Sequence, residues 1–204
     1  MPGKRMENGD RARQLLAQEA ARLIVEHGIR DYRVAKMKAA ERLGMSTLGA
    51  LPRNAEIELA ISEHLQLFGG DAHSDFLRSM RKAALSAMQL LELFTPRLVG
   101  PVLAGTADEN SSVNLHVFAD SAETVAMQLG DLNYRYRAYE RRLKSSRGKG
   151  ATPNIYAGFQ FDHQGEVIEA TVFPIDGIRQ SPISPIDGKP MQRADRKAVE
   201  ALIN

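Results

Sequence analysis

The stretch from Leu98 to Phe118 constrains the fold of this chain more than any other segment. Its apolar run from Leu98 to Leu103 predicts a buried strand. Gly105 then indicates a turn, and residues 106–112 are expected to form a polar loop. From Val113 to Phe118 polar and apolar residues alternate, which predicts a second strand with one buried and one polar face. We therefore expect two neighbouring, paired strands beside an open groove.

Composition places the chain among ordinary globular proteins. Its 204 residues are 43% hydrophobic and 25% charged, enough for a sizeable core. No apolar run approaches the roughly 20 residues of a membrane-spanning helix, so no membrane partner is expected. The absence of cysteine excludes disulfides, thiolate zinc sites and cysteine nucleophiles. It also fits a reducing compartment, and we expect a cytoplasmic protein whose oligomeric state the sequence leaves open.

The pattern of apolar residues changes at Pro96. Before it, helical spacing predicts four helices, with Asp31 and Asn54 as N-cap candidates. After it, strands alternate with one short helix that begins near Ser121, and a proline-rich arm leads to a last helix. The sequence thus predicts an α+β fold: a helical N-terminal region (10–93), a mixed β-sheet domain (94–175) and an extended arm with a C-terminal helix (176–204).

Two short segments resemble the signature of the nucleotidyltransferase superfamily, of the DNA polymerase β type. That family places a Gly-Ser pair after a strand and an Asp-x-Asp in the next strand. This chain has Gly100-Pro101 at the first position and Ser112-Val113-Asn114 at the second. The order of elements from about Leu91 to Pro174 is also similar. The resemblance implies a nucleotidyltransferase-like sheet domain with a phosphate-handling cleft.

The resemblance also implies a magnesium site, but the residues here have lost its charge. The family holds two Mg²⁺ ions with carboxylates, whereas Ser112 offers a hydroxyl and Asn114 an amide. Glu169, on a later strand, stands where a third carboxylate is expected. We therefore assign no catalytic residue and no metal ligand, and Mg²⁺ is the one cofactor left open. An alternative keeps the enzyme active with ligands moved to Asp108, Glu109 and Glu169.

The residues that we assign to nucleotide binding flank the turn or share a polar strand face with it: Gly100, Gly105, Thr106, Ser112, Asn114, His116 and Glu169. Gly105-Thr106 offers a backbone and hydroxyl contact that Pro101, which has no N–H, cannot provide. The alternative explanation is that Ser112, Asn114 and His116 form the solvent face of a half-exposed strand.

A second candidate surface is basic. Alternate residues of the expected strand 134–143 share a face, and a Gly-flanked basic loop follows. We assign polyanion binding to this set, with Tyr139 as a platform for a base: Arg135, Arg137, Tyr139, Arg141, Lys144, Arg147 and Lys149. The alternative is an edge strand protected by cations.

These features together predict a nucleotidyltransferase-like pseudoenzyme that binds a nucleotide or nucleic acid without strong two-metal catalysis. Whether any enzymatic activity remains is left open, and if the chain is an enzyme it is a nucleotidyltransferase. A third hypothesis is a helix-turn-helix DNA-binding regulator, because the second N-terminal helix is basic. The cations of the N-terminal helices are Arg30, Arg33, Lys36, Lys38 and Arg42. The C-terminal arm wraps the domain or brings Arg179 or Lys189 near phosphate.

Overall fold

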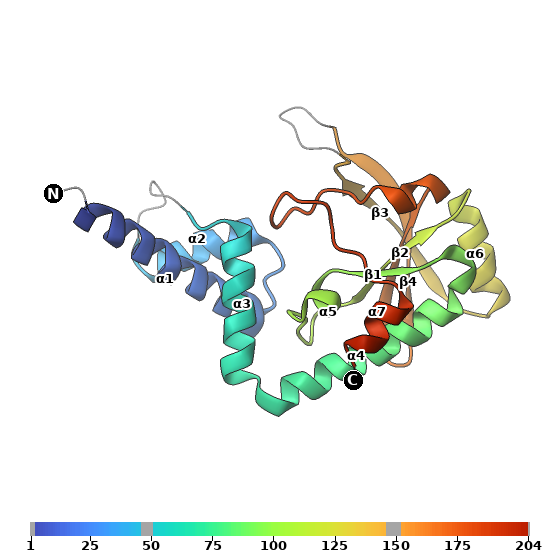
Figure 1. Ribbon diagram of the computed structural model, residues 1–204, viewed down its shortest axis with the longest axis horizontal. Helices are drawn as coiled ribbons and strands as arrows, with labels where there is room; N and C mark the ends of the chain where they lie inside the picture. Colours follow the sequence, from blue (N-terminus) through green and yellow to red (C-terminus); the bar gives the residue numbers. More distant parts are fainter. Residues whose placement is uncertain (1–2, 46–50, 146–151, 204) are drawn as a thin grey trace. The chain divides into compact units, whose positions relative to one another are not determined.

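The computed structural model describes residues 3–45, 51–145 and 152–203 and has the α+β fold expected from the sequence (Figure 1). The chain forms two compact units. One contains the residues up to His73 together with Pro185–Asp187, and the other contains Ser74–Ser184 and the residues from Gly188 onward. Within the described residues, no helix is both long and apolar enough to cross a membrane.

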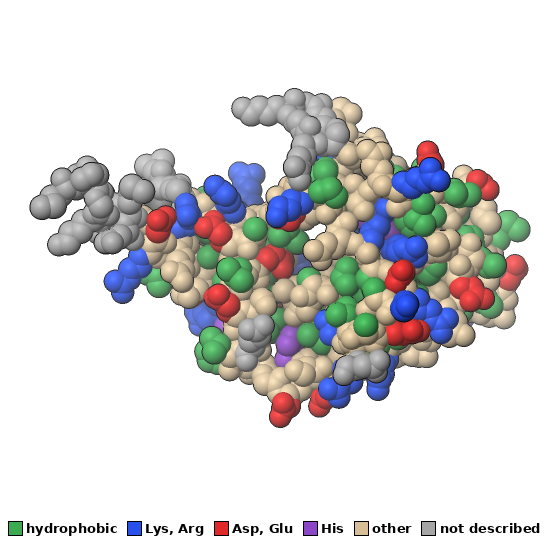
Figure 2. Space-filling view, viewed as in Figure 1, with side chains coloured by type: hydrophobic (Ala, Val, Ile, Leu, Met, Phe, Trp, Pro, Cys, Tyr) green, Lys and Arg blue, Asp and Glu red, His purple; other side chains and the backbone are tan. Residues whose placement is uncertain are grey.

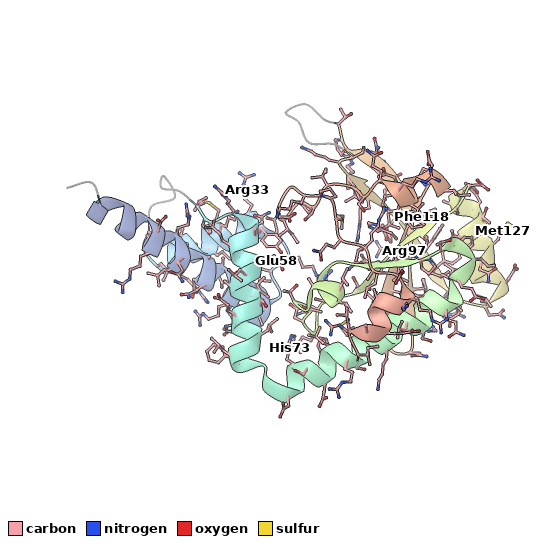
Figure 3. The ribbon with its side chains drawn as sticks, viewed as in Figure 1. Arg33, Glu58, His73, Arg97, Phe118 and Met127 are labelled. Carbon is pink, nitrogen blue, oxygen red and sulfur yellow. The ribbon has the colours of Figure 1, made fainter. Side chains whose placement is uncertain are left out.

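Three helices build the first unit: α1 (Gly3–His27), α2 (Tyr32–Arg42) and α3 (Asn54–Phe68). Their shared core includes Leu23, Ala39 and Ile57, which are almost completely buried. Asp31 caps α2 as expected, because its carboxylate accepts hydrogen bonds from the backbone N–H groups of the next turn. The Tyr32 hydroxyl donates to Glu58 of α3, which Figure 3 labels.

Helix α4 (Gly70–Leu90) contains the boundary between the units. The sequence grouped this helix with the N-terminal region that ends at residue 93. In the structure the body of α4 belongs to the second unit, since its apolar face is part of the core of that unit: Leu77, Met80, Ala84, Ala87 and Met88. Burial of this face, rather than helix content, decides where α4 belongs.

A five-stranded mixed sheet forms the centre of the second unit. Its strands are β1 (Arg97–Val99), β2 (Val113–Phe118), β3 (Tyr136–Leu143), β4 (Asn154–His163) and β5 (Glu166–Phe173). They lie in the order β1-β2-β5-β4-β3, with β2 and β5 parallel and every other neighbouring pair antiparallel. The expected β4–β5 hairpin is confirmed, and Gln164 and Gly165 make its turn with positive φ angles of 53° and 84°.

The two faces of this sheet differ in chemistry. Val113, Leu115 and Val117 of β2 are completely buried on one face, in a core that also contains residues of α4 and of α6 (Ala122–Asp131) (Figure 1). The other face carries the polar residues of β2 and β5. The short helices η1 (Glu92–Phe94) and η2 (Ile175–Arg179), the arm and α7 (Arg196–Ala201) complete the unit.

The prediction of a strand over residues 98–103 is wrong for the second half of this segment. β1 ends at Val99, and Pro101–Ala104 forms a helical turn, α5. Gly100 has a φ of 74°, in the region that favours glycine, and so turns the chain out of the strand. Pro101 then starts the helix, because it has no N–H to donate to a ladder and its fixed φ suits the first helical turn. Apolar residues alone do not distinguish these two structures.

Tyr139 of β3 lies flat across β4 at Gly158, its register partner. A Cβ added at Gly158 would come within 2.6 Å of the Tyr139 ring and hydroxyl, so glycine makes room for the ring. The hydroxyl reaches Thr171 of β5, with an oxygen–oxygen distance of 2.8 Å. Burial raises the pKa of Tyr139. One face of the ring therefore rests on the sheet and is closed to the base stacking expected of Tyr139.

We expect Gly158→Ala to lower the free energy of unfolding by about 1–3 kcal/mol, because the new methyl group displaces a packed ring. Urea denaturation measures the change. Gly130→Ala is the matched control: it lies in α6 with open space where a Cβ would project, and alanine there should stabilise the helix by about 0.5–1 kcal/mol. Equal effects of the two substitutions would contradict this role for Gly158.

Candidate functional site

The candidate site is the polar face of the sheet where β2 and β5 run side by side. The parallel register pairs Asn114 with Glu169 and His116 with Thr171, so these four side chains share one face. Gly100 borders the site, since a Cβ there would lie 3.4 Å from the Asn114 amide nitrogen. That nitrogen donates to the backbone oxygen of Ser112 at 3.0 Å. The structure therefore brings together five of the seven residues that the sequence assigned to nucleotide binding.

Gly105 and Thr106 lie apart from these five. Gly105 ends α5 in a left-handed conformation, and a Cβ there would lie 3.7 Å from Arg81 of α4. The backbone N–H of Thr106 closes the same helical turn by donating to Pro101. The sequence predicted that Gly105 and Thr106 contact the nucleotide beside Asn114. In the structure both residues instead end the α5 turn, away from Asn114.

Arg141 reaches the site from β3, the strand at the opposite edge of the sheet from β1. Its guanidinium donates to the Asn114 amide oxygen at 2.9 Å and forms an ion pair with Glu169. To make both contacts the side chain passes from β3 across β4 to β5 and β2. It also lies over the Tyr139 ring, 5.4 Å from the ring centroid. A single cation therefore binds the two groups that the family resemblance associates with metal ions.

A second arginine, Arg193 of the C-terminal arm, lies against His116. Its Nε donates to His116 Nδ1 at 3.0 Å, and its Nη1 donates to the backbone oxygen of Gly177 at 2.8 Å. The guanidinium lies 5.0 Å from the ring centroids of Phe118 and Phe173. Burial, together with the charge of Arg97, lowers the pKa of Arg193 to about 10.

His116 is neutral at physiological pH. Its ring is 1% exposed, and burial, followed by the charges of Arg193 and Arg141, lowers its pKa to about 3. Because Nδ1 accepts from Arg193, the proton of the neutral ring lies on Nε2, which has no partner among the described residues. This burial excludes, for His116, the explanation that the polar residues of β2 form a solvent face.

The basic surface expected from the sequence is only partly assembled. Arg137 and Arg141 lie on the face of the site with Tyr139, whereas Arg135 precedes β3. Lys144 follows β3, and its backbone oxygen accepts from Ile183 of the arm. Arg147 and Lys149 lie outside the described residues. Figure 2 shows Lys and Arg side chains gathered over the region where Figure 1 labels β2 and β3.

Sequence reasoning missed three residues of this face. Arg193 comes from an irregular arm, in which no periodicity indicates where a side chain lies. Arg97, labelled in Figure 3, pairs in register with His116, and strand alternation identifies its face only once the β1–β2 register is known. Tyr156 pairs with Arg141 on β4, and its ring packs on Phe173.

The residues present do not fit a magnesium site. Mg²⁺ prefers anionic oxygen. In the part of the chain that the structure describes, the one carboxylate beside Asn114 is that of Glu169, which is already paired with Arg141. The Asp108 carboxylate accepts from the backbone N–H of Asn110 and from the Ser111 hydroxyl, which closes its own turn. Among the described residues, no group of three or more His, Asp or Glu side chains is placed to hold a metal ion.

We expect Mn²⁺, as a probe for Mg²⁺, to leave the melting temperature unchanged at millimolar concentration, because Arg141 already neutralises Glu169. The double variant Asn114→Asp with Arg141→Ala should gain a metal-dependent rise, since it places two free carboxylates side by side. The single variant Asn114→Asp is the control, because Arg141 remains to pair with both acids. A metal-dependent rise in the unmodified protein that Glu169→Gln abolishes would contradict this interpretation.

The low pKa of His116 predicts acid sensitivity. An unfolded histidine binds a proton below about pH 6.5, whereas folded His116 stays neutral down to about pH 3. Between these values the unfolded state binds more protons, so the free energy of unfolding falls as the pH falls. From pH 6.5 to pH 5 this group alone should cost about 2 kcal/mol.

His116→Gln should remove this part of the pH dependence, because the Gln side-chain oxygen can still accept from Arg193 without titrating. Urea denaturation at several pH values measures both proteins. His163, whose pKa burial also lowers, remains in both and cancels in the comparison. Parallel curves for the two proteins would show that His116 is not the group responsible.

Comparison with known proteins adds no relative to this description. The chain matches no family model, no curated protein sequence and no solved structure. The resemblance to nucleotidyltransferases therefore rests on the residues quoted from the sequence and stays a prediction.

Proposed function

We propose that the polar face of the sheet binds the phosphate groups of a nucleotide, and that arginines rather than metal ions hold them. The supporting observation is the bridging position of Arg141 between Asn114 and Glu169. Because Arg141 neutralises Glu169, the positive charges of the other arginines on this face (Arg97, Arg137 and Arg193) are not compensated within the described part of the chain. Their planar N–H donors suit phosphate oxygens. Arg141 also removes the carboxylate charge on which two-metal catalysis would depend.

The charge balance of the face supports an anionic ligand. Arg97, Arg137 and Arg193 share the face with the Arg141–Glu169 pair, and none of the three has a carboxylate partner among the described residues. Arg193 is half-buried, and its acceptors among the residues that the structure describes are carbonyl oxygens and a neutral imidazole. A partly desolvated cation without a counter-ion attracts an anion more strongly than a solvated surface lysine does.

The family resemblance narrows this anion to a nucleotide. Gly100 and the polar residues of β2 occupy the positions of the family signature with which a nucleotidyltransferase binds a nucleoside triphosphate. Gly100, Asn114 and Glu169 lie next to one another here, which is consistent with that use of the sheet. The resulting proposal is a nucleotide-binding, nucleotidyltransferase-like pseudoenzyme, without the charge needed for strong two-metal transfer.

The two alternatives have less support. An active enzyme with relocated ligands needs Asp108, Glu109 and Glu169 grouped around an ion, but no such group of three is found among the described residues. A helix-turn-helix regulator needs an aligned basic surface on the first unit. Arg42, one of the cations of that hypothesis, contacts Glu19 of α1, which also pairs with Arg22. No observation in the first unit favours DNA over solvent as the partner of its cations.

Titration calorimetry with ATP in the presence of EDTA tests the proposal. We expect binding without metal, and about tenfold weaker binding for Arg137→Ala, which removes one charged donor from the face. Arg142→Ala is the matched control, because Arg142 is exposed on the opposite face of the same strand. The affinity should also fall with added salt. Absence of binding by both ATP and GTP, or an equal loss in the Arg142 variant, would overturn the proposal.

A further inference from the structure

We propose that a small pocket next to the arginines receives the base of the bound nucleotide. The pocket lies in the second unit, between the end of β5, the start of β4 and η2, and has a volume of about 220 Å³. Ligand pockets for whole drug-sized molecules are larger, from about 300 Å³ upward. This pocket therefore suits one planar ring system, with the rest of the ligand outside it. The inference rests on the proposed function and specifies where the ligand lies.

The aromatic wall of the pocket is rigid. The Tyr156 ring packs on Phe173 with a centroid distance of 4.3 Å, and Phe173 is 2% exposed. Phe173 also packs against His116, with 4.4 Å between the ring centroids. Phe173 is buried, so the half-buried Tyr156 ring is the aromatic surface that the pocket offers to a base. Such a fixed ring suits stacking, because every base has a π face.

The polar lining favours a base edge rich in N–H groups. The Asn154 amide nitrogen donates to the Ser145 hydroxyl at 2.9 Å, which fixes the amide and leaves its oxygen to accept from a ligand. Asp176 and Gln180 line the same pocket and add a carboxylate and a second amide. Asp176 can only accept hydrogen bonds, so it gives the lining one anionic acceptor. Guanine, with adjacent ring and amino N–H groups, is the base whose edge matches a carboxylate best.

The pocket adjoins the cationic face, because two of its lining residues contact Arg193. Gly177 lines the pocket, and its backbone oxygen accepts from Arg193. Phe173 lines the pocket too, and the Arg193 guanidinium lies 5.0 Å from its ring centroid. Tyr156 is the register partner of Arg141. A base in the pocket therefore lies beside the residues that contact Arg193 and Arg141, and we infer that the phosphates of the same nucleotide extend toward these arginines.

Calorimetry with two probes in EDTA tests this inference: GTP, and inorganic tripolyphosphate, which has the phosphates without a base. We expect GTP to bind at least about tenfold more tightly, which is the contribution of one stacked base. Tyr156→Leu and Gln180→Ala should each weaken GTP binding about fivefold or more and change tripolyphosphate binding less than twofold. Gln180 is exposed, so its variant keeps the test valid if the Tyr156 variant fails to fold. Ile155→Ala, next to Tyr156 and 55% exposed, is the matched control.

The outcomes separate this inference from the proposed function. If GTP and tripolyphosphate bind equally and neither pocket variant discriminates between them, the pocket holds no base, while phosphate binding by the arginines stands. If GTP binds more tightly but only the Ile155 variant weakens it, the base lies elsewhere and the inference is overturned. If no phosphate compound binds, the proposed function fails and this inference fails with it.

Discussion

The alternation of apolar and polar residues along β2 is the constraint on which the second unit depends. Val113, Leu115 and Val117 are completely buried, so one face of the strand is committed to the core. The residues between them must then lie together on the opposite face, and a shift of one residue would exchange the two sets. Parallel pairing with β5 extends this division, since it sets Glu169 beside Asn114.

The polar face that results needs its charge balanced, and the chain balances it with arginine. A carboxylate in a partly buried position is costly unless a cation or hydrogen-bond donors accompany it. Arg141 supplies both to Glu169 and also fixes the Asn114 amide. Tyr139 and Gly158 support this arrangement, because the ring lies in the space that a larger residue at Gly158 would occupy. The same contacts that stabilise the face leave no free carboxylate for a divalent ion.

Local signals predicted most of the elements and part of the site. Asp31 as a helix cap, the β4–β5 hairpin and the two faces of β2 follow from propensity and periodicity, and the structure confirms them. The extent of β1 was predicted wrongly, since an apolar run fits a strand and a buried helical turn equally well. Arg193 had no local signal at all, because its place beside His116 depends on the path of an irregular arm.

The sequence by itself determined which residues of each element face the core, and therefore the α+β class and the polar face of β2. Periodicity carries that information because side chains point in directions fixed by the local backbone. Only the tertiary structure decided what meets on that face: the pairing of Arg141 with Glu169, the burial of His116 under Arg193, and the separation of Gly105 from Asn114. These contacts join residues far apart in the chain, and their geometry depends on strand order and register, which no single segment encodes.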